Sequence, residues 1–413
     1  MAGNAQGERI NGALFLSGIA LRLALFSFPV VADALSSRIE LATPVTSYKR
    51  LKEGVFLYDN GVAPYDGGPF HQAPLLLCIF SFLESIPFYY TTPVLYSLID
   101  AAIALCLQKI TLLHQTQDAE KPKLAIEKDK QPIHPSTVAA LYLFNPLAIL
   151  SCISRSSVIF TNLSIVVALL WAQLGRTNIS MCWAAVATYF GFYPAMLVPP
   201  LIMIDKKCNV GHAIGCYLAG LGVLLGLSRL LVGSWNFIPA TYGVVIFLSD
   251  LTPNVGMFWY FFIEIFDQFR SFFMVIFQFH AFIFAAPLCI RLREHPLFVC
   301  AVLTGVMSVF KSYPAAGDVA LFLGLVPLHQ QLFKYCRYGF LVANIFLYSS
   351  VLAPIFWHLW IYAGSGNANF FYAITLVYNL GQALLIVDLI YAILRREYDI
   401  AHPENIGKVV IHK

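Results

Sequence analysis

The sequence predicts an all-helical membrane protein, a bundle that crosses the bilayer many times. Hydrophobic residues make up 59% of its 413 positions and charged residues only 12%, whereas a soluble domain carries about 25% charged residues. A backbone surrounded by lipid must satisfy its hydrogen bonds internally, so it forms helices or a closed barrel. The apolar runs here are long and continuous, without the alternation of a barrel strand, and they therefore favour helices.

We expect about twelve transmembrane helices in a single integral membrane domain, residues 1–413. The first apolar run lacks a convincing cleavage site, so we interpret it as a retained signal anchor and not a removed signal peptide. The fifth and sixth spans are short and meet at a turn containing Gly191 and Pro194. The predicted spans cover 12–32, 93–113, 136–154, 157–175, 179–191, 193–204, 212–233, 270–290, 296–312, 317–333, 338–361 and 370–394.

Lysine and arginine in short loops predict the orientation of these spans. Such residues gather on the cytosolic side of membrane proteins. In this count, Arg176, Lys206, Arg291 and Arg395 all fall on one side. We therefore predict that this side is cytosolic, together with the loop 114–135 and both termini.

The opposite, lumenal side receives two long loops, 33–92 and 234–269. Each contains an apolar stretch interrupted by acidic residues such as Glu84 and Glu264, which we expect to form in-plane or re-entrant helices at the membrane interface. An alternative is that 73–91 spans the bilayer, which would move the lysine-rich loop to the lumen. The charge bias argues against that alternative.

Charge and cysteine patterns exclude several classes of function. The net charge of +4 is spread over loops without a basic stripe, so nothing indicates nucleic-acid binding. The nine cysteines include no CxxC pair, and Cys152 and Cys300 lack a plausible histidine partner, so we predict no catalytic residue, no metal and no cofactor. Two glycosylation motifs, at Asn162 within a span and at Asn178 on the cytosolic side, should carry no glycan.

The segment 356–382 is the main candidate for a binding site. Aromatic residues flank a Gly-Ser-Gly turn, and two asparagines follow it. Amide side chains both donate and accept hydrogen bonds, which suits hydroxyl-rich or phosphate-bearing lipid headgroups, and a polar residue inside the next apolar run is costly and often functional. The candidate residues of this segment are His358, Asn367, Asn369, Phe370, Phe371, Tyr372 and Asn379.

Lys311 is a further candidate, because it lies at the lumenal membrane edge against the positive-inside trend. It can extend to water or meet an anionic headgroup phosphate. Asp318, which follows in the same short turn, can cap the next helix.

The first lumenal loop is rich in turn residues and carries a Glu53-Gly54 pair, a Gly-x-x-Pro-Tyr turn at 61–65 and a closing Pro74. This layout resembles the class-C glycosyltransferases that use dolichol-phosphate sugars, in particular the GPI mannosyltransferases. The resemblance implies a similar helical scaffold. Those enzymes place an acidic pair where this sequence has only Glu40, and one carboxylate is a poor site for a divalent ion. An ordinary ion pair of Glu40 with Arg38 or Lys49 is the alternative interpretation.

Several longer motifs are similar to the PIG-U family, the multi-span subunits of the GPI transamidase. They are Ser-Trp-Asn-Phe-Ile-Pro at 234–239, Asp-Leu-Thr-Pro-Asn-Val-Gly-Met-Phe-Trp-Tyr-Phe-Phe at 250–262, Trp-His-Leu-Trp-Ile-Tyr-Ala-Gly-Ser at 357–365 and Phe-Phe-Tyr-Ala-Ile-Thr at 370–375. The resemblance covers nearly the whole chain and is weakest at 114–135 and 201–233.

This resemblance implies a multi-pass protein of the endoplasmic reticulum membrane that works in a hetero-oligomer with the cysteine protease-like catalytic subunit and other membrane or lumenal subunits. It implies a non-catalytic role in binding and presenting the GPI lipid, carried by Asn367, Asn369, Phe370, Phe371 and Tyr372, with His358, Lys311 and Asn379 as further candidates. One alternative is an active lumenal mannosyltransferase dependent on dolichol-phosphate-mannose. A transporter is disfavoured, because only one pair of short, broken helices is evident.

Overall fold

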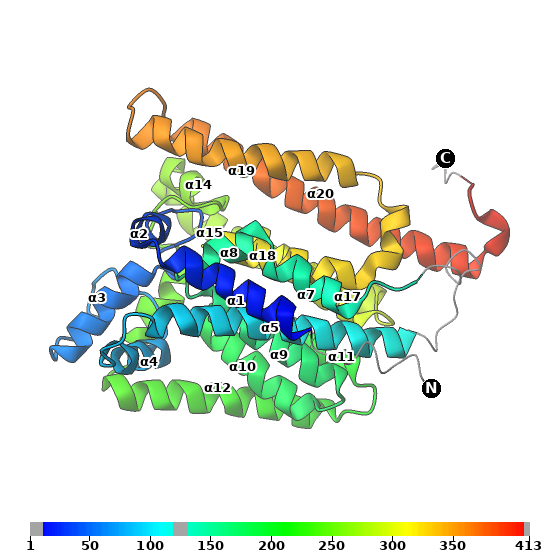
Figure 1. Cartoon of the computed structure of the whole chain (residues 1–413), viewed down its shortest axis with the longest axis horizontal. Coiled ribbons are helices and arrows are strands. Elements are labelled where there is room, and N and C mark those ends of the chain that lie inside the picture. The colour runs from blue at the N-terminus through cyan, green and yellow to red at the C-terminus, as the bar shows by residue number, and fades with distance from the viewer. Residues whose placement is uncertain (1–10, 119–130, 409–413) are drawn as a thin grey trace.

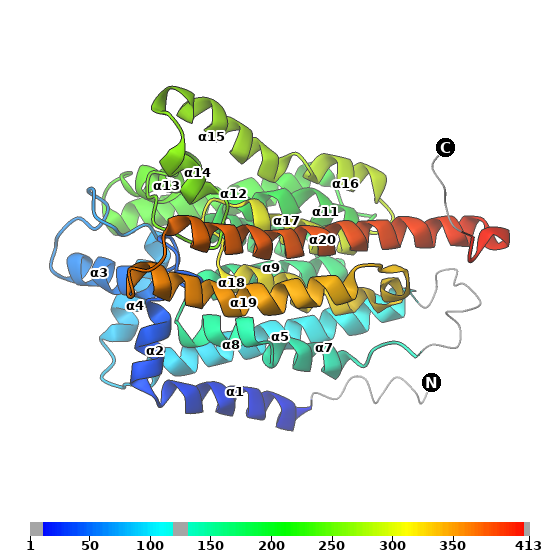
Figure 2. The ribbon, with the colours of Figure 1, turned by 90° about the horizontal axis from the view of Figure 1, so that it is seen from above.

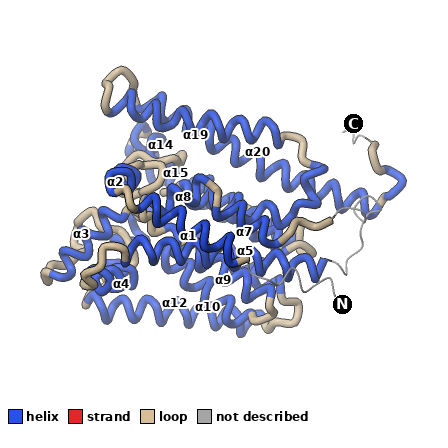
Figure 3. Tube along the Cα trace, viewed as in Figure 1, coloured by secondary structure: helices blue, strands red, loops and turns tan. Residues whose placement is uncertain are grey.

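The computed structural model describes residues 11–118 and 131–408, and these residues form helices and loops without a strand (Figure 3). Most helices run along the long axis of the molecule, as Figure 1 shows. The beginning of α1 and the end of α20 lie at the same end of the bundle, the right-hand end in Figure 1. The opposite end gathers α2, α3, α4 and the turn between α19 and α20.

The helices of the first half are α1 (Gly12–Phe26), α2 (Pro29–Ser36), α3 (Tyr48–Asp59), α4 (Pro74–Glu84), α5 (Thr91–Asp118), α7 (Pro135–Leu143), α8 (Pro146–Ile153), α9 (Val158–Gln173), α10 (Thr177–Gly191), η1 (Tyr193–Leu197), α11 (Val198–Ile204) and α12 (Val210–Val232). Those of the second half are η2 (Pro239–Gly243), α13 (Val244–Phe247), α14 (Phe258–Glu264), α15 (Asp267–Phe282), α16 (Ala285–Arg291), α17 (Pro296–Phe310), α18 (Ala316–Leu325), η3 (Val326–Tyr335), α19 (Gly339–Ile361), α20 (Ala368–Ala401) and η4 (Pro403–Asn405).

The centre of the bundle is formed by α17, where every residue from Leu297 to Val309 is buried. α18 packs antiparallel beside it, and α9, α10, α5 and α7 complete the core. Close packing needs small residues at the crossings. A side chain at Gly317 would clash with Val158, and one at Gly305 would clash with Phe322.

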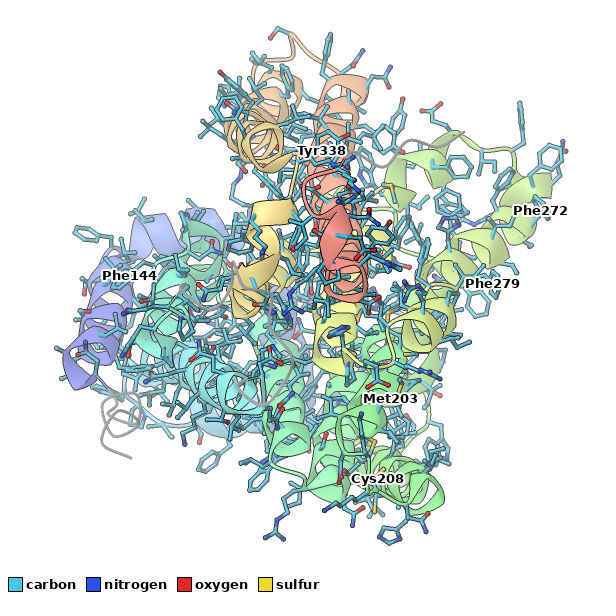
Figure 4. The ribbon with its side chains drawn as sticks, turned by 90° about the vertical axis from the view of Figure 1, so that its right-hand side faces the viewer. Phe144, Met203, Cys208, Phe272, Phe279 and Tyr338 are labelled. Carbon is cyan, nitrogen blue, oxygen red and sulfur yellow. The ribbon has the colours of Figure 1, made fainter. Side chains whose placement is uncertain are left out.

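The periphery of the bundle is apolar and exposed, as expected of helices that face lipid or partner subunits. α12 and α19 lie on opposite sides of the molecule (Figure 1), and α15 projects from a third flank (Figure 2). Phe272 and Phe279 point outward from α15, away from the bundle, and each is 61% exposed (Figure 4).

The number of long helices is smaller than the twelve predicted spans. In the described part of the chain, five helices are long and apolar enough to cross a bilayer, and the count rises to seven if each of two bent pairs is one span. Other predicted spans appear as shorter helices, such as α9 with 16 residues and α17 with 15. Length alone therefore supports a multi-pass helical protein and leaves the count of twelve a prediction.

The first predicted span, 12–32, is not straight. α1 ends at Phe26, and α2 begins at Pro29 after a bend of 89°. Proline has no backbone N–H and favours the first turn of a helix, so Pro29 starts a new helix and does not continue the old one. The segment 136–154 bends by 51° in the same way, at Pro146.

The two predicted lumenal loops contain short helices. The loop 33–92 holds the end of α2, all of α3 and the 11-residue α4, and 234–269 holds η2, α13 and α14. α4 is too short to cross a bilayer unaided. Of the loop 114–135, residues 119–130 lie outside the described part of the chain.

Candidate functional site

The turn between α19 and α20 is shaped by hydrogen bonds within its own backbone. The N–H groups of Ser365 and Gly366 both donate to the carbonyl of Leu359, at 3.0 Å each. Gly364 has a φ of +63°, a conformation that glycine adopts without strain. Asn367 then ends the turn in an extended conformation, and its side-chain oxygen accepts from the N–H groups of Asn369 and Phe370. Asn367 is therefore the N-cap of α20.

Asn369 and Tyr372, on the first turn of α20, join this helix to α14. The Tyr260 hydroxyl donates to the side-chain oxygen of Asn369. The Tyr372 hydroxyl donates to the carbonyl of Met257 at 3.0 Å, and the two tyrosine rings lie 4.6 Å apart. The amide nitrogens of Asn367 and Asn369 have no hydrogen-bond partner among the described residues, and both side chains are exposed.

An aromatic cluster supports the turn from beneath. Phe371 is fully buried and lies 6.3 Å from Trp259 and 5.3 Å from Trp357, measured between ring centroids. Trp259 stacks on Trp360 at 6.3 Å. Phe370 differs, because 53% of it is exposed. The cluster therefore presents Phe370 and the two asparagines on a rigid apolar base.

His358 and Asn379 do not belong to the exposed edge that Asn367, Asn369 and Phe370 form. The ring of His358 stacks on Tyr362 at 5.4 Å and is exposed, on the last turn of α19. Asn379 is buried, and its amide nitrogen donates to the carbonyls of Val255 and Thr375, at 2.8 Å each. Its oxygen accepts from Gln382 at 3.3 Å. Asn379 holds α20 against the 250–257 loop and has no surface of its own for a ligand.

Lys311 is paired within the protein. Its ammonium group lies 2.7 Å from a carboxylate oxygen of Asp318, and only 13% of the lysine side chain is exposed. The other oxygen of Asp318 accepts from the N–H of Ala315 at 2.8 Å, which confirms that Asp318 caps α18. A lysine that is half-buried and already paired is weakly available to an anionic headgroup.

A small cavity of about 50 Å³ lies beside Lys311, between the first turn of α9, the junction of α10 with η1, and the η2–α13 segment. His71, Gln72 and Thr161 also line it. Its size corresponds to a few water molecules. It therefore has no room for the oligosaccharide part of a glycolipid.

The loop 33–92, predicted to be lumenal, forms ion pairs. Glu40 pairs with Arg38 at 2.6 Å, which confirms the ordinary ion pair that the sequence offered as the alternative to a catalytic acid. Arg50 donates to Asp250 at 2.6 Å and to Thr252 at 3.3 Å. The loops 33–92 and 234–269 are thereby joined over a separation of 200 residues.

Asp250 and His71, which lie in these loops, have shifted pKa values. Burial raises the pKa of Asp250, but hydrogen bonds from Thr252 and Arg50 outweigh it and leave this pKa below 3.8. Burial lowers the pKa of His71 below 6.5, in spite of the hydrogen bond that its Nδ1–H donates to Ala240. At neutral pH the pair is therefore a carboxylate beside a neutral imidazole.

The predicted site residues thus separate into three groups. The structure brings Asn367, Asn369 and Phe370 together at an exposed edge, with Phe371 and Tyr372 as their support. His358 lies on the adjoining turn of α19. Asn379 and Lys311 lie inside the bundle and hold helices together.

Sequence reasoning missed two charged groups that the structure shows to be important. Arg22 is fully buried in α1 and pairs with Asp100 in α5. Arg155 follows α8 with a left-handed backbone. A charge within or beside an apolar run was the available signal in both cases. No group of three or more metal-ligating side chains occurs among residues 11–118 and 131–408.

Comparisons with known proteins agree with the motifs of the sequence. The family model described as GPI transamidase subunit PIG-U matches residues 16–378. The GPI-anchor transamidase component PIGU of Homo sapiens is 38% identical over 412 residues, which cover 93% of each chain. The GPI transamidase component GAB1 of Saccharomyces cerevisiae is 38% identical over 391 residues, covering 93% of this chain and 94% of that protein. A GAB1 homolog of Schizosaccharomyces pombe is 33% identical over 91% of each chain.

Proposed function

The chain belongs to the PIG-U family of GPI transamidase subunits, and we propose that, as such a subunit, it binds the GPI lipid at the turn between α19 and α20. The contact residues in this proposal are Asn367, Asn369 and Phe370. Phe371 and Tyr372 position them, and His358 lies beside them. The observation that carries the proposal is a pair of exposed amide nitrogens, without a partner in the described ranges, on an aromatic base.

The chemistry of this edge suits a sugar-phosphate lipid. Each free amide N–H donates to a hydroxyl or phosphate oxygen. Phe370 offers an exposed ring that suits the apolar face of a sugar or the first methylenes of an acyl chain. Because both asparagine oxygens are already bonded within the protein, the amide groups cannot turn freely. A preorganised site loses less conformational entropy on binding.

The role that we propose is non-catalytic. The relatives are named as components of a transamidase and not as mannosyltransferases. The carboxylate of Glu40 forms an ion pair with Arg38. Hydrolysis would also need an activated nucleophile, and the sequence indicates none. We expect Glu40→Gln to be tolerated. A variant without activity in an intact complex would revive the mannosyltransferase alternative.

The remaining parts of the proposal concern the membrane and the partners. We place the chain in the endoplasmic reticulum membrane, with twelve spans on a scaffold like that of the class-C glycosyltransferases and with both termini in the cytosol. It works there in a hetero-oligomer with the cysteine protease-like subunit and other subunits. α1 begins and α20 ends at the same end of the bundle (Figure 1). This arrangement supports placing both termini on one side of the membrane.

The test is a double substitution, Asn367→Ala with Asn369→Ala, in cells that lack the native chain. We expect surface display of GPI-anchored proteins to fall about tenfold, because each lost hydrogen bond weakens binding by about 0.5–1.5 kcal/mol. Co-purification of the other subunits should be unchanged. Normal display and normal GPI content of the purified complex would remove the site assignment.

A matched control separates binding from packing. Asn344 lies on α19, is half-buried, and donates to the carbonyl of Phe340 in its own helix. Asn344→Ala removes an amide from the same hairpin without touching the proposed site. It should leave display at the native level.

A further inference from the structure

Arg155, in the loop between α8 and α9, has an unusual backbone conformation. Its φ is +55°, in the left-handed region that costs free energy for a residue with a Cβ atom. The surrounding structure holds it there, because the buried hydroxyl of Tyr96 donates to the Arg155 carbonyl at 2.8 Å. A glycine would adopt this conformation without strain. An arginine at this position therefore suggests that its side chain is needed.

The guanidinium group of Arg155 lies between aromatic rings and has no counter-ion in the described part of the chain. It lies 5.0 Å from the ring centre of Tyr48 and 5.6 Å from that of Phe26. Its Nε atom is buried without a hydrogen-bond partner, and no carboxylate of the described residues pairs with it. Glu84 accepts from the Tyr48 hydroxyl and pairs with Lys52. Two aromatic rings thus hold the guanidinium group of Arg155 by cation–π contacts. Its N–H donors make no hydrogen bond within the described residues and are available to a ligand.

The surroundings of Arg155 are polar on one side and apolar on the other. The hydroxyl of the next residue, Ser156, is buried without a partner among the described residues, and α9 begins at Val158 with Ser157 as an N-cap that makes no side-chain hydrogen bond. On the other side, α1 and α2 both pack on α8, and their bend exposes Phe28 by 61% and Val30 by 82%. This is the end of the bundle opposite the beginning of α1 (Figure 1).

We propose that Arg155 binds the phosphate group of an anionic membrane phospholipid at the bend between α1 and α2. A guanidinium fork matches two phosphate oxygens, and the uncapped beginning of α9 favours a negative charge nearby. The exposed apolar residues of the bend provide a surface for the acyl chains. A water-soluble anion would gain nothing from that surface, so the observations favour a lipid.

This site is separate from the proposed GPI site. It involves α1, α3 and the loop between α8 and α9, whereas the proposed GPI site lies on α14, α19 and α20, and the two share no residue. A structural lipid there would fasten the bend against the bundle. The proposal therefore stands or falls independently of GPI binding.

The experiment uses the full chain with its co-purified subunits in nanodiscs of phosphatidylcholine that contain a minor fraction of phosphatidylinositol. Native mass spectrometry of the released complex counts retained phosphatidylinositol. We expect Arg155→Gln to lower retention about tenfold, in line with the loss of charged hydrogen bonds. Arg155→Lys should retain an intermediate amount, because it keeps the charge and loses the fork.

Two further variants keep the test decisive. Arg155→Gly relieves the backbone strain, so the protein should fold and still lose the lipid. Arg229→Gln is the control, because Arg229 is a half-buried cation on the last turn of α12 and has no aromatic pair around it. Retention should be unchanged in Arg229→Gln.

Three results would overturn the proposal. One is unchanged phosphatidylinositol retention in Arg155→Gln and Arg155→Gly. Another is displacement of the lipid by inorganic phosphate alone, which would indicate a simple anion site. The third is a crosslink from position 155 to an acidic segment of a partner subunit, which would assign the arginine to a protein interface.

Discussion

Asn367 carries out two tasks with the two ends of one amide group. Its oxygen caps α20 by accepting from two backbone N–H groups, and its nitrogen is exposed beside Asn369. Loss of display in an alanine variant could therefore reflect a frayed helix as well as a lost ligand contact. The two tasks are separable, because aspartate is as good an N-cap as asparagine and lacks the amide donor.

We predict that Asn367→Asp keeps the thermal stability of the purified complex and lowers GPI content, because the carboxylate caps α20 but repels a lipid phosphate. Asn367→Ala should lower both, with a cost of about 1 kcal/mol from the lost cap. Thermal unfolding and mass spectrometric measurement of bound GPI check the two quantities separately. Native GPI content in Asn367→Asp would show that only the cap matters.

The environment of His71 predicts that the contact between the loops 33–92 and 234–269 depends on pH. Its pKa in the folded state is lower than 6.5, mainly because of burial, so the neutral form is favoured by folding. The stability that it contributes is present above about pH 6.5 and is lost as the pH falls through the lower, folded pKa. Asp250 also has a lowered pKa, but its contribution is lost only below 3.8.

Between about pH 7 and about pH 5, only His71 of this pair should change the melting temperature. His71→Asn offers an amide N–H in place of Nδ1 and does not titrate, so we expect a smaller decrease over this range. Asp250→Asn should instead lower stability by about 1–2 kcal/mol at both pH values, because hydrogen bonds to a half-buried carboxylate are weakened. If the melting temperature falls equally over this pH range in the native chain and in His71→Asn, this histidine is not the cause.

At the level of helices, α1 is fastened to the bundle by a buried charged network. Arg22 donates to Asp100 on α5 at 2.6 Å and to the carbonyl of Leu143 at 3.0 Å. The Tyr142 hydroxyl donates to the other oxygen of Asp100 at 2.9 Å. Each charge in this network compensates another, so removing one member leaves an uncompensated charge in an apolar surrounding.

We predict that Arg22→Met or Asp100→Leu alone costs about 3–5 kcal/mol, whereas the double variant recovers most of that loss, because a packed apolar pair can replace a buried ion pair. Unfolding of the purified chain in mild detergent, combined as a double-mutant cycle, gives the coupling energy. Tyr142→Phe should cost about 1 kcal/mol. If the losses of stability in the two single variants simply add up in the double variant, Arg22 and Asp100 do not form a direct network.

The sequence predicted helices well and their breaks poorly. Pro146 begins a helix because Asn145, in an extended conformation, caps it by accepting from Leu147. Pro354 lies inside α19 and does not end it. Both prolines stand in long apolar runs, so the apolar pattern alone does not tell which of them begins a helix. Only local geometry decides this, so the apolar pattern overestimated the length of several spans.

The candidate site shows the same division between local and distant information. The Gly-Ser-Gly turn and the two asparagines are local, and the sequence identified them. The contacts of Tyr260 with Asn369 and of Met257 with Tyr372 join residues more than 100 positions apart. These contacts make the site rigid, and they were not predictable from spacing along the chain. Lys311 was chosen for its position, and its partner Asp318 only became evident in the packed turn.

At the level of the whole molecule, the two ends of the bundle are formed by different elements. One end has the beginning of α1, the end of α20 and the loop before α12, and the other has α3, α4 and the α19–α20 turn (Figure 1). If the first end faces the cytosol, then only the second end meets the lumenal glycosylation machinery. Two exposed asparagines allow a test with one substitution each.

Val62→Thr creates a glycosylation motif at Asn60, which follows α3 and is exposed. Gly211→Ser creates the same motif at Asn209, before α12, where an added Cβ meets only ordinary van der Waals contact. We predict that the first variant gains a glycan, seen as a glycosidase-sensitive shift in gel mobility, and that the second gains none. The natural motif at Asn178 lies near the Asn209 end and should likewise remain unmodified. A glycan at Asn209 and none at Asn60 would invert the orientation, and it would place the asparagine turn on the wrong side of the membrane for a lumenal GPI headgroup.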